Sequence, residues 1–170
     1  MSEKTNIRLR VNGIFYERNA DPRTLLVDFL RHSIGLKGAH VGCAHGVCGA
    51  CTVQIDSRSA RSCLHFAIDL QGCDIKTVEG LANGDELHPI QQSFHENHAL
   101  QCGYCTPGFL MTIEEFLRHN SNPTEEEIRE SLADNICRCT GYANIVKAVM
   151  DAAKKLRGEV ILEGGKDVSP

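Results

Sequence analysis

The first eighty residues of the chain alternate between apolar and polar positions, as strands with one buried face do. Apolar residues occupy every second position from Ile7 to Val11, and Asn12-Gly13 follows directly. Asn-Gly is a strongly favoured sequence for a two-residue hairpin turn, so residues 7–11 and 14–18 predict a β-hairpin. The same criteria predict further strands at residues 52–55, 59–62 and 74–78.

A helical spacing interrupts the strands once and then dominates after residue 84. Thr24 fits the N-cap of a helix with an apolar stripe made of Leu25, Leu26, Phe29 and Leu30. Four later segments are predicted to start as helices at Pro89, at Pro107, at the capping box of Thr124 and Glu127, and after Gly141. The chain therefore predicts an α+β fold, with strands in residues 1–82, four helices in 83–158 and a C-terminal tail in 159–170.

The composition is that of an ordinary globular protein and excludes some function classes. The 170 residues are 42% hydrophobic, carry a formal net charge of -4 and have their Lys and Arg residues spread along the chain. A nucleic acid is therefore not expected as a partner. The N-terminus offers no apolar segment typical of a secretory signal or a membrane span, so we expect a cytoplasmic protein without a membrane partner.

Cysteine changes this picture, because eight of the nine cysteines fall into two groups of four. The first quartet consists of Cys43, Cys48, Cys51 and Cys63. Its C-x4-C-x2-C spacing, followed after eleven residues by the fourth cysteine, is the plant-type pattern of 2Fe-2S ligands. The loop also contains Gly42, Gly46 and Gly49, which let backbone N–H groups approach cluster sulfurs closely.

The second quartet is less specific. It consists of Cys102, Cys105, Cys137 and Cys139, as a C-x2-C and a C-x-C that are separated by thirty-one residues. This spacing alone leaves both an iron-sulfur cluster and a four-cysteine zinc site open. Disulfides are a third option, but nothing in the sequence indicates export. Cys73 is left over, and we expect it to be a small buried apolar residue.

Four blocks of sequence carry a resemblance to a known family. They are V-G-C-A-H-G-V-C-G-A-C-T-V at 41–53, S-C at 62–63, Q-C-G-Y-C-T-P-G at 101–108 and N-I-C-R-C-T-G-Y at 135–142. In order and spacing the blocks resemble the small iron-sulfur subunit of the molybdenum hydroxylases, the xanthine oxidase family in its split-subunit form. That group includes aerobic carbon monoxide dehydrogenase, quinoline and nicotinate hydroxylases, and 4-hydroxybenzoyl-CoA reductase. The resemblance extends from about Ile7 to about Leu156.

The resemblance implies a β-grasp plant-type ferredoxin domain followed by a four-helix-bundle domain, each with one 2Fe-2S cluster held by one quartet. It also implies that Gln101 and Cys139 contact the pterin of a molybdenum cofactor on a large partner subunit. That cofactor would be molybdopterin of the cytosine dinucleotide type, and FAD would lie on a medium subunit. The family habit is a dimer of heterotrimers.

The implied function is electron transfer within an oxidoreductase. Single electrons would pass from the molybdopterin site through the two clusters to FAD, with no substrate chemistry on this chain. A stand-alone two-cluster ferredoxin is the alternative. A redox-sensing or structural zinc protein is a third hypothesis.

Several residues beside the cysteines carry further expectations. His45 is expected to be an exposed loop residue, since four cysteines already complete the first ligand set. Arg138 could pair with a cofactor phosphate or lie in solvent. Tyr104 and Tyr142 are expected to pack against the clusters and exclude water. The cysteines of the second quartet are expected at helix entrances, where unpaired N–H groups favour thiolates.

Overall fold

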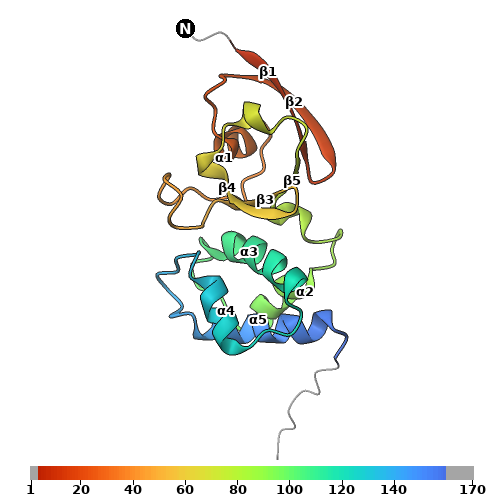
Figure 1. Cartoon of the computed structure of the whole chain (residues 1–170), viewed down its shortest axis with the longest axis vertical. Coiled ribbons are helices and arrows are strands. Elements are labelled where there is room, and N and C mark those ends of the chain that lie inside the picture. The colour runs from red at the N-terminus through yellow and green to blue at the C-terminus, as the bar shows by residue number, and fades with distance from the viewer. Residues whose placement is uncertain (1–3, 160–170) are drawn as a thin grey trace, which may run out of the picture.

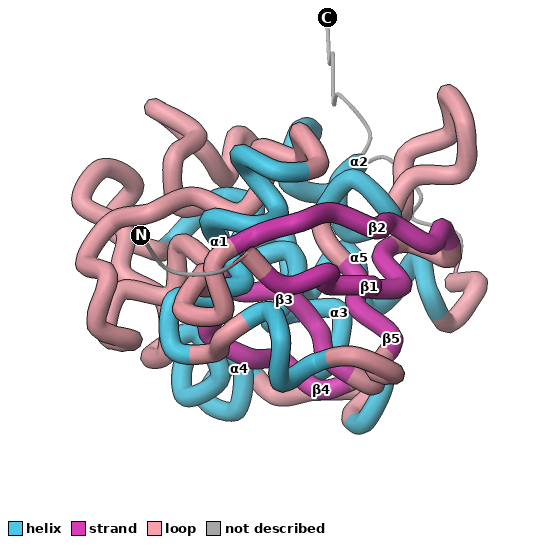
Figure 2. The backbone as a smooth tube through the Cα atoms, turned by 90° about the horizontal axis from the view of Figure 1, so that it is seen from above, coloured by secondary structure: helices cyan, strands magenta, loops and turns pink. Residues whose placement is uncertain are grey.

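The computed structural model describes residues 4–159, in which a sheet-containing part is followed by a helical part (Figure 1). The strands are β1 (Thr5–Val11), β2 (Ile14–Ala20), β3 (Thr52–Ile55), β4 (Arg58–Arg61) and β5 (Asp74–Lys76). They form one sheet in the order β2-β1-β5-β3-β4, in which β1 and β5 are parallel and the other neighbours antiparallel. Figure 2 shows the strands lying over the helices. The predicted tail lies outside the described residues, except for Glu159.

The predicted β1–β2 hairpin is confirmed. Asn12 and Gly13 have φ angles of 50° and 79°, the left-handed pair that a two-residue type I′ turn requires. The inward positions of β1 are fully buried, namely Ile7, Leu9 and Val11. The predicted strand 52–55 is found at the same residues, whereas 59–62 is found at 58–61, and 74–78 stops at Lys76 because Val78 begins a 3-10 turn.

The helix after the hairpin differs from the prediction at its start. It consists of α1 (Leu26–Asp28), which continues into a π-helical turn at Phe29–Ser33. Thr24 is not its N-cap, because Leu25 holds that position and no side chain caps the helix. The Thr24 carbonyl instead accepts a hydrogen bond from the N–H of Ala67 at 2.9 Å, so a neighbouring segment fixes this residue. The predicted apolar stripe is buried at Leu26, Phe29 and Leu30.

Four helices follow, as the sequence predicts. They are α2 (Pro89–Glu96), α3 (Thr106–His119), α4 (Glu125–Leu132) and α5 (Ala143–Leu156). Pro89 and Pro107 lie in first turns, and Thr124 with Glu127 forms the capping box of α4. Gly158, at a φ of 74°, follows the end of α5. The helices bury their own apolar core, separate from that of the sheet. No helix within residues 4–159 is long and apolar enough to cross a membrane.

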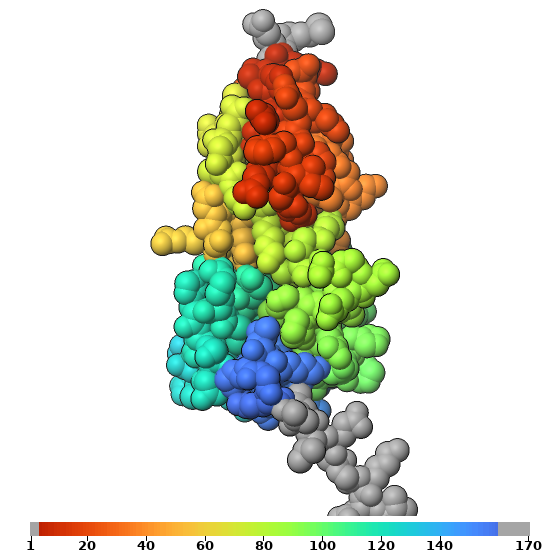
Figure 3. Space-filling model, turned by 90° about the vertical axis from the view of Figure 1, so that its right-hand side faces the viewer, coloured from red at the N-terminus to blue at the C-terminus, as the bar shows by residue number. Residues whose placement is uncertain are grey.

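Helix α3 lies against the sheet and joins the two parts, which are in contact in the space-filling view (Figure 3). The buried side chain of Gln54 on β3 donates to the Met111 carbonyl at 3.0 Å and to the Glu114 carboxylate. The backbone N–H of Ser59 donates to Glu115 at 2.6 Å. Polar side chains of α3 thus satisfy polar groups of β3 and β4, which fixes how the parts pack together.

Glu114 is the charged centre of this interface. Its carboxylate lies 3.4 Å from Lys76 Nζ and 3.7 Å from the Arg118 guanidinium. Burial by itself raises the pKa of Glu114, but the hydrogen bond from Gln54 and the charges of Lys76 and Arg118 bring that pKa below its ordinary value. The carboxylate is therefore ionised at neutral pH and pairs with Lys76 on β5.

His88 connects the stability of α2 to pH. Its Nδ1 accepts a hydrogen bond from the Ile90 N–H at 3.3 Å, and the backbone N–H of His88 donates to the Gln91 side chain at 2.9 Å. Desolvation by burial lowers the pKa of His88 below the ordinary 6.5. The neutral ring is therefore the form that the folded protein prefers, because only an unprotonated Nδ1 can accept.

We expect the contribution of His88 to the free energy of unfolding to be complete above about pH 6.5 and to fall as pH drops below it, because the unfolded chain binds the proton more readily. His88→Asn keeps a capping acceptor that does not titrate, so it should flatten this part of the profile. Urea unfolding from about pH 8 to about pH 5 measures the slope. A slope equal to that of the wild type would assign the acid sensitivity to other groups.

Candidate metal centres

The first quartet lies in the loop before β3 and in the turn after β4. Cys51 and Cys63 are buried, while Cys43 and Cys48 are partly exposed. Backbone N–H groups of His45 and Cys48 donate to Cys43 Sγ over 3.5 and 3.3 Å, and these bonds lower the pKa of Cys43 to about 6. Burial, together with the neighbouring Cys51, raises the pKa of Cys63 to about 11. The loop thus directs N–H groups at sulfur, as the sequence predicts.

Two glycines of this loop have no room for a side chain. A Cβ at Gly42 would lie 2.8 Å from Cys48 Sγ. At Gly49, where φ is 74°, a Cβ would lie 2.5 Å from the side-chain nitrogen of Asn135. Gly42 therefore lets the backbone pass a cysteine sulfur, and Gly49 lets the loop contact the helical part.

The second quartet occupies two loops of the helical part, one before α3 and one before α5. Cys102 and Cys139 are exposed, and their Sγ atoms are 3.6 Å apart. Cys105 is half-buried and Cys137 is buried, and their side chains interact with each other. One pair of this quartet therefore faces outward and the other faces the helical core.

Cys105 lies at a helix entrance, as predicted, and a backbone hydrogen bond there lowers the pKa of its thiol, but burial outweighs this benefit. This residue is the N-cap of α3 but makes no side-chain capping bond, and burial followed by the neighbouring Cys137 raises the pKa of its thiol to about 12. At Cys137 burial also raises the pKa, but hydrogen bonds from Thr140 outweigh it and lower the pKa overall. Hydrogen bonds from Thr140 thus favour the thiolate of Cys137.

The sulfurs of both quartets come in pairs. The interacting pairs are Cys43 with Cys48, Cys51 with Cys63, Cys102 with Cys139, and Cys105 with Cys137. Within residues 4–159, no group of three or more His, Cys, Asp or Glu side chains converges on one metal position. A 2Fe-2S cluster is held by four cysteine thiolates, two on each iron. Each quartet supplies four cysteines whose side chains interact with one another, so the residues present fit such a cluster.

Both parts match families of cluster-binding domains. Residues 9–80 match the family described as "2Fe-2S iron-sulfur cluster binding domain", and residues 77–150 match the "[2Fe-2S] binding domain". One chain in the crystal structure of quinoline 2-oxidoreductase from Pseudomonas putida 86 has the same fold, with a TM-score of 0.88 and 45% identity. The match covers 94% of this chain and 100% of that chain.

Named relatives agree with the structural match. The chain is 54% identical to caffeine dehydrogenase subunit gamma from Pseudomonas sp. (strain CBB1), over 84% of this chain and 87% of the relative. It is 49% identical to the nicotine 6-hydroxylase small subunit of Paenarthrobacter nicotinovorans, over 89% and 91%. The chain belongs to the xanthine oxidase family. It is an electron-transfer subunit of an oxidoreductase, with two 2Fe-2S clusters and larger partner subunits.

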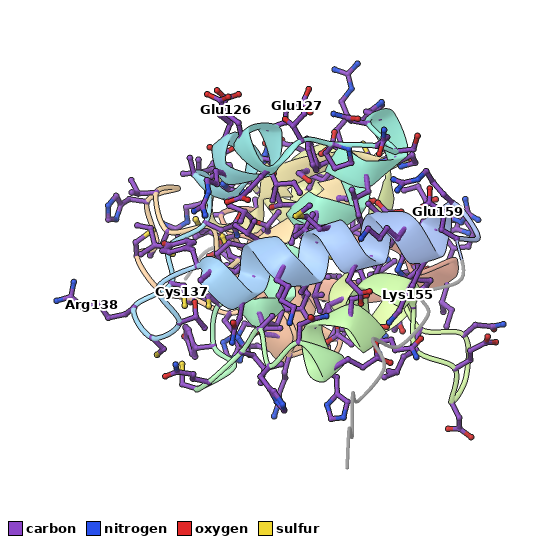
Figure 4. All side chains as sticks on the ribbon, turned by 90° about the horizontal axis from the view of Figure 1, so that it is seen from below. Glu126, Glu127, Cys137, Arg138, Lys155 and Glu159 are labelled. Carbon is purple, nitrogen blue, oxygen red and sulfur yellow. The ribbon has the colours of Figure 1, made fainter. Side chains whose placement is uncertain are left out.

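The iron-sulfur subunit exposes one end of its second quartet. Gln101 is exposed and directly precedes Cys102, whose sulfur contacts that of Cys139. Arg138 is also exposed, and Figure 4 shows its side chain pointing away from the protein beside Cys137. Both predicted pterin contacts, Gln101 and Cys139, thus lie at a surface where a partner can reach them.

Both tyrosines beside the cysteines make hydrogen bonds to the backbone of the cysteine loops. The Tyr142 hydroxyl accepts from the Cys137 N–H at 2.8 Å and donates to the Asn135 carbonyl at 3.2 Å. The Tyr104 hydroxyl donates to the Val41 carbonyl at 2.8 Å, and its ring stacks on His40. Its shielding of a cluster stays a prediction; in the structure Tyr104 is 48% exposed and belongs to neither apolar core. It joins the loops of the two parts instead.

Sequence reasoning gives no role to Asn135, which is buried where the two cysteine loops meet. Its side-chain N–H donates to the Gly49 carbonyl at 3.0 Å, and its side-chain oxygen accepts from Thr112 at 2.9 Å. The signal that could have indicated it is a polar amide immediately before Ile136 and Cys137. His45, in contrast, is exposed as predicted, with Nδ1 2.6 Å from the Cys43 carbonyl oxygen.

Proposed function

We propose that this subunit relays single electrons from a molybdopterin site on a large partner subunit, through its two 2Fe-2S clusters, to FAD on a medium subunit. Residues 1–82 would form a β-grasp plant-type ferredoxin domain and residues 83–158 a four-helix-bundle domain. Residues 159–170 would form a tail. The separate cores of the sheet and the helices support this division.

The proposed ligands are the eight paired cysteines. The first cluster would be held by Cys43, Cys48, Cys51 and Cys63, and the second by Cys102, Cys105, Cys137 and Cys139. Cys73 would hold no iron, because it packs against the core of the sheet. Thiols with a raised pKa, such as that of Cys105, would release their protons on binding iron.

One contact carries the relay proposal. The backbone N–H of Ile136 donates to the carbonyl of Cys48 at 3.0 Å. Cys48 belongs to the first quartet, and Ile136 is bonded to Cys137 of the second. A direct backbone hydrogen bond therefore joins the peptide segments of both quartets, whose loops lie on the same side of the molecule in Figure 1. An electron moving between the clusters would pass through packed protein atoms and not through solvent.

The exposed end of the second quartet supports an entry point for electrons. Gln101 and Cys139 would contact the pterin there, since both are exposed and lie beside the outward pair of sulfurs. The molybdenum cofactor, when bound to its own subunit, supplies the two-electron oxidation of the substrate. This chain supplies position, burial and hydrogen bonding to the clusters. The partly exposed Cys43 and Cys48 would face the FAD-binding subunit.

Exposed apolar side chains around the cysteine loops favour a permanent subunit over a stand-alone ferredoxin. Val47, Leu64 and Ile136 are each more than half exposed, and all three lie next to a proposed ligand. Apolar side chains gathered around a site are typical of surfaces that a partner covers. We propose a dimer of heterotrimers in the cytoplasm, with molybdopterin of the cytosine dinucleotide type and no nucleic-acid or membrane partner. A reducing compartment suits cysteines that must remain thiolates.

Purification through a tag on this chain tests the proposal. We expect two larger chains, molybdenum and flavin to co-purify, with about four irons and about four acid-labile sulfides per small subunit. The sample should be brown and should bleach with dithionite. An iron-loaded monomer without partners would support the stand-alone ferredoxin, whereas a colourless zinc protein would contradict both electron-transfer proposals.

Gln101→Ala should leave both clusters in place and slow the entry of electrons from the partner. The side chain is exposed, so its removal costs the fold little, whereas a lost cofactor contact affects docking and coupling. Stopped-flow reduction of the clusters by substrate should slow, while reduction by dithionite should not. Gln92→Ala, at an exposed position on α2, is the control. Unchanged reduction by substrate in the Gln101 variant would rule out the pterin contact.

A further inference from the structure

Asn135 is a buried polar residue whose side-chain hydrogen bonds lie at the junction of the two cysteine loops with α3. Only 1% of its surface is exposed. Its amide N–H donates to the Gly49 carbonyl at 3.0 Å, and its amide oxygen accepts from the Thr112 hydroxyl on α3 at 2.9 Å. Its backbone carbonyl accepts from the Tyr142 hydroxyl at 3.2 Å. The side chain therefore has a fixed orientation, with its N–H directed at the first cysteine loop.

The partners of Asn135 place it beside the link between the quartets. Gly49 immediately follows Cys48, and Asn135 immediately precedes Ile136, so the side-chain bond to Gly49 runs next to the backbone bond from Ile136 to Cys48. Two adjacent hydrogen bonds restrain the rotation of one cysteine loop relative to the other as well as the distance between the loops. Without the amide, the Ile136 bond would be the nearest polar restraint between these two loops.

Close packing leaves the loops no room to slide. A Cβ at Gly108, in the first turn of α3, would lie 2.2 Å from the Gly49 carbonyl oxygen. A Cβ at Gly49 would lie 2.5 Å from the Asn135 amide nitrogen. The backbone of the first loop thus touches the backbone of α3 on one side and the Asn135 amide on the other. This contact is close enough for a shift of one loop to displace the other.

We propose that Asn135 is a positioning residue that sets the distance and orientation between the two clusters, and thereby the rate of electron transfer between them; this inference rests on the proposed relay. In that step one electron leaves the cluster of the second quartet, which is oxidised, and enters the cluster of the first quartet, which is reduced. No bond or proton need move. Asn135 would act through its hydrogen bond to Gly49 and through the adjacent Ile136.

The test uses the intact complex carrying Asn135→Ala. We expect both clusters to be present, and the splitting that two nearby reduced clusters produce in each other's low-temperature EPR signals to shrink. The intercluster electron-transfer rate should fall with it. The backbone amide of Ile136 should exchange its hydrogen faster, and mass spectrometry of the peptide that contains Ile136 measures this exchange. Exchange does not depend on activity, so it reports the junction directly.

Two further variants make the result decisive. Thr112→Val removes the hydroxyl that orients the amide, and should change the splitting and the exchange in the same direction by less. It carries the test if Asn135→Ala fails to load iron. Asn97→Ala is the matched control, because Asn97 is a partly buried asparagine bonded to Ser93 and Asp151 away from the junction. It should leave the splitting and the Ile136 exchange unchanged.

The outcomes separate this inference from the proposed function. Wild-type splitting, transfer rate and exchange in an iron-loaded Asn135→Ala complex would overturn the positioning role and leave the relay intact. The same changes in Asn97→Ala would also overturn it, since general loosening of the helical part would then explain them. A wild-type protein without iron would instead contradict the proposed function.

Discussion

Replacing Cys43 with serine should remove the cluster of the first quartet and leave the cluster of the second, so that iron per chain falls by about half. Cys43 accepts two backbone hydrogen bonds and pairs with Cys48, so a serine there withdraws a proposed ligand from one iron. The second quartet should survive because the helices have a core of their own. EPR of the reduced protein should show loss of the plant-type signal alone.

The chain supplies a matched control in its ninth cysteine. Cys73 lies just before β5, is partly buried and packs against the core of the sheet. Cys73→Ser should keep the full iron content and both EPR signals. If Cys43→Ser instead removed both signals, the two sites would not form independently, and the division at residues 82 and 83 would be wrong.

Replacing Gly108 with alanine should lower the free energy of unfolding by about 1–3 kcal/mol, the usual cost of overpacking. In an unobstructed helix the same change stabilises by about 0.5–1 kcal/mol, so the sign of the effect is diagnostic. Here the added methyl carbon would lie 2.2 Å from the Gly49 carbonyl oxygen, and a backbone atom cannot move aside cheaply. The helix and the first cysteine loop would have to separate.

Urea unfolding of the iron-loaded complex and hydrogen exchange at Ile136 measure this effect together. Gly72→Ala is the comparison, because its φ of 94° strains any side chain while no atom lies within 4 Å of the added carbon. Gly72→Ala should lower stability through strain and leave the exchange of Ile136 unchanged. A stabilised Gly108→Ala protein would show that the first loop and α3 are not in contact in solution.

Features that depend on neighbours in sequence could be predicted from the sequence. The turn at Asn12-Gly13, the capping box of Thr124 and the prolines at helix starts each act within a few residues, so their patterns suffice. The start of the helix near Thr24 could not be predicted in this way. A hydrogen bond from Ala67, distant in sequence, fixes Thr24 and overrides its capping preference.

The same distinction between local and distant contacts decides how much of each candidate site could be predicted. The spacing of the first quartet predicts a cluster by itself, since three of its cysteines share one loop. The second quartet joins two distant loops, so its spacing leaves zinc open, and it is the match of residues 77–150 to the [2Fe-2S] binding domains that decides for iron and sulfide. The roles of Asn135 and Tyr104 depend on contact between the two parts, which no local pattern records.

The contact between Gly49, Gly108 and Asn135 limits how this protein can evolve. The Gly49 carbonyl oxygen leaves no room for a side chain at Gly108, and the Asn135 amide leaves no room for one at Gly49. A larger residue at one position would be accepted only after a compensating change at another. We therefore expect the three positions to vary together or not at all among homologues, although about sixty or more residues separate Gly49 from the other two in the sequence.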